Sequence, residues 1–229
     1  MKITISLFVL LLLSSCVNFT NIQSARTLGP TKKKDYYIYT RLTVPEVSGE
    51  IEGIMLVPEF VYKKRIKANL DWGLKVGIDA RINGNLKYQF VGNSKSKFAM
   101  SLMPEIGFSL FPTKNSTVHN VPISLQAEIP LLITYHFTDY TFITTAPKIV
   151  DYYTPKGNYG MLAWSTGLQF GKKVNWTLAY SYFKLIDSPN NPLTTSGIKT
   201  SFFDQANVFE LGIKFNFKAR GRMHAPSID

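Results

Sequence analysis

Apolar and polar residues alternate with a period of two along most of the chain after residue 35, and no helical period is sustained anywhere. In residues 174–182, Val174, Trp176 and Leu178 share one face with two tyrosines, whereas Asn, Thr, Ala and Ser occupy the positions between them. Because successive side chains of a strand point to opposite faces, this pattern is typical of strands whose two faces meet different surroundings. The sequence therefore predicts an all-β domain.

About ten strands follow from runs of this kind. They lie at residues 36–44, 54–66, 70–78, 86–90, 98–102, 121–137, 140–152, 162–170, 174–182 and 208–217. The run 140–152 alternates poorly beyond Pro147, and we expect a β-bulge there. The pattern favours one antiparallel up-and-down barrel over residues 35–217.

Small residues are frequent on the polar face, which suits the crowded inside of a barrel. They are Gly73, Gly77, Ser101, Gly107, Ala163, Ser165, Gly167, Ala179, Ser181 and Gly212. Short connections at 67–68, 93–96, 138–139 and 171–173 alternate with longer ones at 45–53, 111–120, 154–158 and 185–205, and only 79–83 is intermediate. Such alternation is typical of outer-membrane barrels with an even number of strands.

Aromatic residues mark the short-connection end of the strands, where rings with an apolar body and a polar edge favour the level of lipid headgroups. They are Tyr36, Tyr62, Trp72, Phe90, Phe98, Tyr135, Phe137, Tyr140, Phe142, Phe170, Trp176, Phe215 and Phe217. With its last run ending in Phe217, the chain resembles small bacterial outer-membrane β-barrels, from which it departs by a basic tail at 218–229. We therefore predict a transmembrane β-barrel; a soluble lipid-binding β domain on a tether is the alternative fold.

The first sixteen residues predict export and lipidation. Lys2 precedes an apolar stretch at 3–13 that is too short to span a bilayer as a helix, so residues 1–15 are expected to be a cleaved signal peptide. Leu13-Ser14-Ser15-Cys16 resembles the lipobox of bacterial lipoproteins. The resemblance implies lipid attachment, with acyl chains such as palmitate, at Cys16, the only cysteine. Val17 follows in place of the aspartate that retains such lipoproteins in the inner membrane, which implies outer-membrane sorting.

Residues 16–34 are polar and without a period, and we expect the lipidated N-terminus to continue into a flexible linker. Lipidation and a barrel together imply outer-membrane lipids, the barrel-assembly machinery and the lipoprotein-sorting machinery as partners. The oligomeric state does not follow from the sequence.

Charged residues on the polar face would lie in the lumen, where a lone charge is expensive. We expect a network of ion pairs or a narrow charged pathway formed by Arg41, Glu59, Lys75, Lys87, Glu105, Glu128, Glu210 and Lys214. An eight-stranded barrel is just filled by its own side chains, so ten strands leave little free bore.

The formal net charge of +11 comes from basic residues that gather at one end of the predicted barrel, which does not favour a nucleic-acid-binding surface. A basic cluster flanks the short connections and is expected to contact anionic headgroups of the inner leaflet. It comprises Lys63, Lys64, Arg65, Lys67, Lys172 and Lys173. The longer connections would then face the cell exterior.

Catalytic chemistry finds little support in the sequence. Of three histidines, His136 adjoins a tight connection, His119 lies in a longer one and His224 lies in the tail. Neither the His-x-Ser strand motif of lipid A deacylases nor the paired acidic motif of the ten-stranded outer-membrane proteases is present, and no metal or cofactor motif is found. We expect a non-enzymatic narrow pore or a structural or surface-interaction component of the envelope. A barrel enzyme, lipid-modifying or proteolytic, remains the alternative.

Overall fold

The computed structural model describes residues 23–30, 32–47, 50–51, 54–77, 81–110, 123–154, 157–172, 174–187 and 205–216. Its strands are β1 (Lys34–Val47), β2 (Glu50–Ile51), β3 (Met55–Lys67), β4 (Leu70–Gly77), β5 (Arg81–Val91), β6 (Phe98–Leu102), β7 (Glu105–Leu110), β8 (Ile123–His136), β9 (Phe142–Thr154), β10 (Gly157–Phe170), β11 (Val174–Asp187) and β12 (Gln205–Asn216). Within these ranges no helix is long and apolar enough to cross a membrane.

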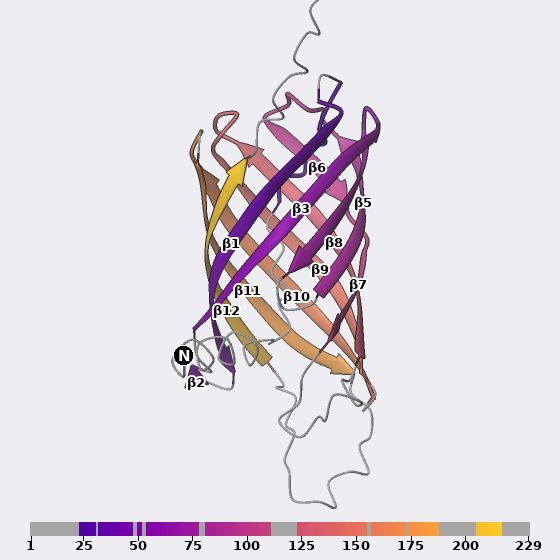
Figure 1. Ribbon diagram of the computed structural model, residues 1–229, viewed down its shortest axis with the longest axis vertical. Helices are drawn as coiled ribbons and strands as arrows, with labels where there is room; N and C mark the ends of the chain where they lie inside the picture. Colours follow the sequence, from indigo (N-terminus) through magenta and orange to yellow (C-terminus); the bar gives the residue numbers. More distant parts are fainter. Residues whose placement is uncertain are drawn as a thin grey trace, which may run out of the picture.

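The sheet closes on itself, because β12 pairs with β1 from Ala206 to Asn216 (Figure 1). β6 and β7 both pair with β5 and β8, so together they count as one strand of the barrel, interrupted at Met103 and Pro104. β2 is a two-residue extension that pairs with the end of β1. The result is a closed antiparallel barrel of ten strands, which confirms the predicted fold class.

The bulge expected near Pro147 is absent, and this prediction was wrong. β9 pairs with β10 in one uninterrupted register, with Pro147 opposite Trp164. On the other side the ladder with β8 skips Ala146 and Pro147, but the register is the same before and after the gap. Proline has no N–H to donate, so the ladder loses a hydrogen bond without shifting.

The connection expected to be long at 154–158 is short. β9 continues to Thr154 and β10 begins at Gly157, with Tyr153 paired to Asn158. Near a membrane surface polar side chains are tolerated on both faces, so the ladder extends beyond the alternating pattern from which we predicted the strand ends. The same barrel end also carries the longer connections at 111–122 and 188–204, which lie outside the described residues.

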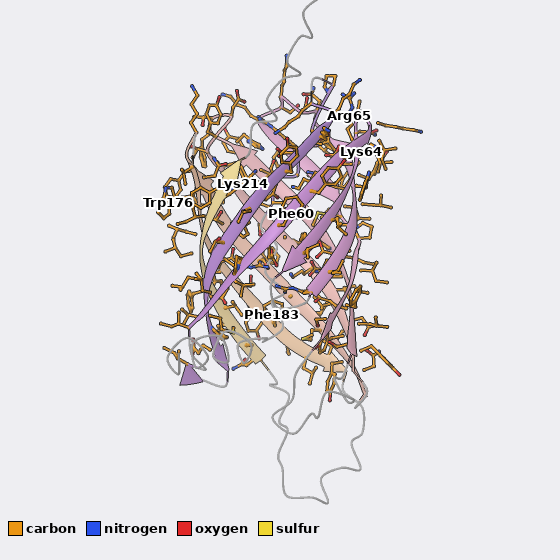
Figure 2. All side chains as sticks on the ribbon, in the orientation of Figure 1. Phe60, Lys64, Arg65, Trp176, Phe183 and Lys214 are labelled. Carbon is orange, nitrogen blue, oxygen red and sulfur yellow. The ribbon has the colours of Figure 1, made fainter. Side chains whose placement is uncertain are left out.

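The two faces of the wall have opposite character. Side chains that point outward are apolar and exposed, for example Leu178 at 49%, Phe60 at 45% and Trp176 at 40% (Figure 2). Those that point inward are mostly polar or charged and buried, among them Glu59 and Glu128. A soluble barrel buries its apolar face, so this inverted arrangement is that of a membrane barrel.

Outward aromatics lie at both ends of this wall. At the short-connection end the exposed rings are Phe90, Phe98, Tyr135, Phe137, Tyr140, Phe170, Trp176 and Phe215. Phe142, which we placed in this girdle, instead faces the lumen and packs on His136 at 4.8 Å between ring centroids. Phe217 lies outside the described residues. Phe108 and Tyr153 are exposed near the opposite ends of their strands and mark a second level that the sequence pattern had not indicated.

Candidate functional site

The middle of the lumen holds ion pairs that join β1 to β3, β3 to β5 and β1 to β12. Glu59 accepts hydrogen bonds from Arg41 and, at 2.8 Å, from Arg81. Arg41 also lies 3.6 Å from Glu210, and Glu210 accepts a hydrogen bond from the Tyr39 hydroxyl. Arg41, Glu59, Arg81 and Glu210 are all buried, so each charge is held by its partners rather than by bulk water.

Two further pairs occupy the β4–β9 side of the barrel. Lys75 donates to Glu105 at 2.5 Å, and Asn83 donates to the other oxygen of Glu105 at 2.7 Å. Lys148 on β9 donates to Glu128 at 3.0 Å. We did not single out Lys148 from the sequence, although it has the same parity as the inward residues of β9, because the weak alternation around Pro147 obscured that strand.

An apolar cluster fills the lumen on the side formed by β9 to β12, towards the longer connections. It consists of Val150, Tyr152, Tyr159, Met161, Ala163, Phe183 and Ala206, with Leu185 and Val208 packed against it. Phe183 is 1% exposed, and the Lys148 ammonium lies 5.5 Å from its ring centroid. The described lumen is therefore occupied by side chains rather than open at this level.

Residues 23–30 lie inside the barrel, at its short-connection end, and not in a flexible linker as we expected. Gln23, Ala25 and Thr27 are buried, and Ala25 is wholly inaccessible. The Ala25 amide donates to the Thr134 hydroxyl at 2.9 Å, and the Ala25 carbonyl accepts from Ser101. The segment has no hydrophobic period because its contacts are hydrogen bonds to a polar lumen.

Further contacts fix this segment along its length. The Thr27 amide donates to Gln89 at 2.9 Å, and the Leu28 amide donates to Asp71 at 2.8 Å. Lys87, one of the predicted lumen charges, donates to the Arg26 carbonyl at 2.6 Å and lies 3.9 Å from Asp71. Since these backbone groups are satisfied by the wall, the segment belongs to the folded barrel.

The Arg26 side chain anchors the same segment to the barrel rim. Its guanidinium donates to the Ser96 carbonyl at 2.8 Å and pairs with Asp139 at 3.2 Å. These partners belong to the two connections at 93–96 and 138–139, which therefore hold the segment from two sides of the rim. Residues 23–30 and their contacts are called the N-terminal plug below.

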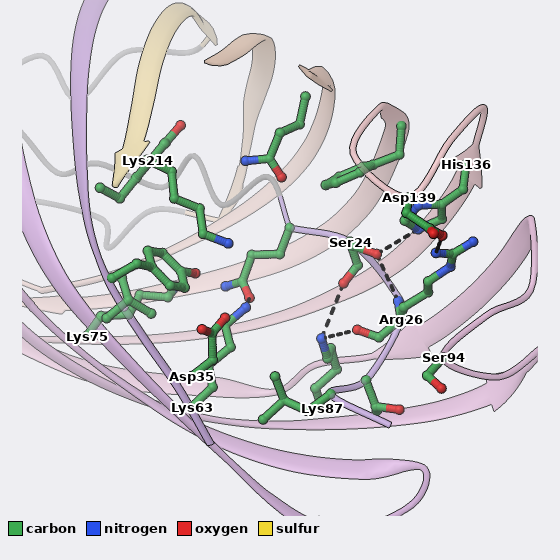
Figure 3. A pocket seen from close by; sticks show the side chains of 18 of the residues that line it. Ser24, Arg26, Asp35, Lys63, Lys75, Lys87, Ser94, His136, Asp139 and Lys214 are labelled. Carbon is green, nitrogen blue, oxygen red and sulfur yellow. Dashed lines mark hydrogen bonds and ion pairs between the residues drawn. The ribbon is translucent and has the colours of Figure 1, made fainter. Parts of the chain in front are cut away.

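A cavity of about 230 Å³ lies between the N-terminal plug and the wall (Figure 3). Nine of its lining residues are charged, six of them basic: Arg26, Asp35, Arg41, Glu59, Lys63, Lys75, Lys87, Asp139 and Lys214. Ser94 and the exposed Asp139 also line it, so the cavity reaches the rim at the short-connection end. Sequence reasoning missed it because one wall is the plug.

Ser24 and His136 meet in this cavity, with the Ser24 hydroxyl 2.9 Å from His136 Nε2. A serine beside a histidine is the start of a nucleophile–base pair. Here, however, Ser24 Oγ also accepts the Arg26 amide at 3.1 Å, and His136 Nδ1 has no hydrogen-bond partner in the described part of the chain. The contact therefore ties the plug to the end of β8.

Members of the predicted basic cluster divide between two environments. Lys64, Lys67 and Lys172 are exposed at the short-connection end, as Figure 2 shows for Lys64. Arg65 donates to the Gly29 carbonyl at 2.6 Å and so also holds the plug. Lys63 was placed at the headgroups wrongly, because its side chain turns into the lumen and donates to Gln23. Lys173 and the predicted lipid site Cys16 lie outside the described residues.

No group of three or more potential metal-ligating His, Cys, Asp or Glu side chains occurs among the described residues. No protein-family model matches the chain, and no curated protein matches it in sequence.

Several solved outer-membrane proteins are similar to this chain at low levels. The attachment invasion locus protein Ail of Yersinia pestis is 11% identical, with 81% of this chain and 98% of that protein covered and a TM-score of 0.34. The outer membrane protease OmpT of Escherichia coli is 11% identical, with 85% and 100% covered and a TM-score of 0.39. Neisserial surface protein A is 9% identical, with 80% and 97% covered and a TM-score of 0.28.

Proposed function

We propose that the protein is a lipid-anchored outer-membrane β-barrel with a closed lumen, which serves as a structural or surface-interaction component of the envelope and not as an enzyme. One observation carries this proposal: the wall is apolar and exposed, and the interior is occupied by side chains and the plug. The wall supports membrane insertion, and the interior supports a role other than bulk transport.

Three levels of the lumen support closure. The N-terminal plug lies at the short-connection end, the Arg41–Glu59–Arg81 ion pairs lie in the middle, and the cluster around Phe183 lies towards the other end. Removing water from the middle of the bore is tolerable because the charges there are paired, and the plug satisfies its own backbone groups. A narrow pore, the other role expected from the sequence, would require these layers to move.

The proposed orientation places the plugged end at the inner leaflet. Exposed lysines at that end would contact anionic headgroups, each contributing about 1 kcal/mol near the membrane surface. The longer connections at 111–122 and 188–204 would then face the cell exterior, where a surface-interaction role would reside. Lipid on Cys16 would favour the same orientation. The chain between Cys16 and Gln23 reaches at most about 25 Å when fully extended, so the lipid would enter the leaflet nearest the plugged end.

Neither alternative is favoured. A soluble β domain would leave Leu178, Trp164 and Ile149 exposed to water at 49%, 50% and 57%, over a wall that is apolar all round. An enzyme would need a nucleophile that is available to react, and Ser24 instead holds the plug, with its Oγ accepting the Arg26 amide at 3.1 Å and lying 2.9 Å from His136.

Closure of the lumen can be measured by solute flux. Purified full-length protein is reconstituted into liposomes, and entry of a small neutral sugar is followed by swelling. We expect rates equal to those of protein-free liposomes, because the plug and the ion pairs fill the bore. Heat-modifiable migration of protein recovered from the same liposomes verifies that the barrel has inserted. Rapid swelling that scales with the amount of inserted protein would contradict closure.

A further inference from the structure

Positive charge is in excess in the plug cavity after the ion pairs around it are assigned. Of the lining carboxylates, Glu59 is engaged by Arg41 and Arg81, and Asp139 by Arg26. Asp35 pairs with Lys32 at 2.7 Å and also attracts Lys63 and Lys214, so one carboxylate faces three ammonium groups. Of the lining cations, Lys75 is held by Glu105, and Lys87 by Asp71 and two plug carbonyls. Lys63 and Lys214 are the remaining cations.

Within the described part of the chain, no carboxylate forms an ion pair with Lys63 or Lys214. Lys214 Nζ lies 4.0 Å from the Tyr37 ring centroid, and Lys63 Nζ lies 5.6 Å from the same centroid. Both cations therefore converge on one buried ring. Figure 3 shows the Lys214 side chain reaching into the cavity.

Two cations held close together inside a barrel repel each other, and their burial is costly without a counter-charge. A ring face offsets part of that cost for Lys214, and the Gln23 side-chain oxygen offsets part of it for Lys63. The nearby carboxylates are already shared with other cations, since Asp35 pairs with Lys32 and Asp71 with Lys87. The arrangement is that of a site whose last component is a ligand with negative charge.

The dimensions of the cavity limit the ligand. A volume of about 230 Å³ is far above the ~10–15 Å³ that one water requires, and it is below the ~300 Å³ at which pockets for drug-sized molecules begin. Lysine ammonium groups bind phosphate oxygens as point charges. Because the cavity reaches the rim beside Ser94 and Asp139, the ligand can enter from the short-connection end.

We propose that this cavity binds one small oxyanion of the phosphate class between Lys63 and Lys214, with Tyr37 and the plug residue Gln23 completing the site. The bound group is either a free phosphate or the phosphate of a lipid headgroup at the same membrane face. In both cases the oxyanion joins the plug to the wall, since Gln23 belongs to one and Lys214 to the other.

Inorganic phosphate is the first probe. The full-length protein in a nonionic detergent is titrated with phosphate at constant ionic strength, and the heat of binding is measured. Lys63→Gln and Lys214→Gln are each expected to weaken binding about tenfold or more, as the loss of a hydrogen bond to a charged group does. Lys64→Gln removes an exposed cation beside Lys63 and is expected to leave the affinity unchanged.

Folding of each variant is verified by heat-modifiable migration, which should be retained because neither lysine belongs to an ion pair. Glycerol 3-phosphate, which carries the phosphate of a phospholipid headgroup, is titrated in parallel. Tighter binding of glycerol 3-phosphate than of phosphate indicates a headgroup, and the reverse order indicates a free anion. Absence of phosphate binding to the wild type, or equal affinity in Lys63→Gln, Lys214→Gln and the wild type, overturns the proposal.

Discussion

Glu59→Gln is expected to lower the free energy of unfolding by about 3–5 kcal/mol, because it removes the partner of a buried charge. Glu59 is 5% exposed and accepts hydrogen bonds from both Arg41 and Arg81. The amide keeps the shape of the carboxylate but leaves two guanidinium groups with less negative charge nearby. Urea unfolding of the protein in detergent micelles, followed by tryptophan fluorescence, measures the change.

A matched carboxylate at the rim provides the control. Asp139→Asn also removes one charge from an arginine, but the Asp139 side chain is 78% exposed, so water replaces the lost partner. This change is expected to cost less than about 1 kcal/mol. In the double variant Glu59→Gln/Arg81→Gln the loss should be smaller than the sum of the two single losses. Equal, small effects of Glu59→Gln and Asp139→Asn would show that the lumen is hydrated.

Leu178→Arg on the outer face of β11 is expected to destabilise the inserted barrel by about 2–4 kcal/mol, because the charge would lie deep in the hydrocarbon. Leu178 is 49% exposed on the wall and is paired with Leu211 and Leu168 on the neighbouring strands. Reversible unfolding from phospholipid vesicles measures the loss.

Ile186→Arg is the matched control on the same strand. Ile186 is 55% exposed, also faces outward, and precedes the last residue of β11. An arginine there can reach the headgroups, and the expected cost is about 0–1 kcal/mol. Equal costs at both positions, or a gain in solubility of Leu178→Arg without detergent, would favour the soluble domain.

The strands could be predicted because successive residues of each strand face lipid and lumen in turn. Lumen charges such as Arg41 and Glu105 follow from the same rule. That rule also places Lys63 on the inner face, because it lies four residues after Glu59 on the same strand. We assigned Lys63 to the headgroups because it is next to the other basic residues of the cluster in the sequence. Strand ends are set by the backbone hydrogen bonds between strands and not by side-chain alternation, so the short connection before Gly157 was missed.

The N-terminal plug could not be predicted by any periodicity. Its residues make no repeating pattern, and its partners Gln89, Thr134 and Asp71 are polar lumen residues far away in the sequence. A segment bound through backbone hydrogen bonds leaves little mark on its own side chains. The Ser24–His136 contact and the cavity depend on that segment, so they emerge only once the chain is folded.

Barrel insertion that is independent of the lipid is the central claim, since the apolar wall should hold the protein in the membrane by itself. The direct test replaces residues 1–16 by a leader that ordinary signal peptidase cleaves, with serine in place of Cys16. The quantity measured is the fraction of protein that stays with outer membranes after an alkaline carbonate wash. Fatty-acid labelling of the wild type, absent from this variant, verifies that the tether has been removed.

We predict that most of the serine variant remains in the carbonate-washed outer membrane, with the heat-modifiable migration of the wild type, because the exposed wall and not Cys16 supplies the insertion energy. Release of the variant as a compact soluble monomer would contradict the account, because the β domain would then depend on its tether to reach the membrane.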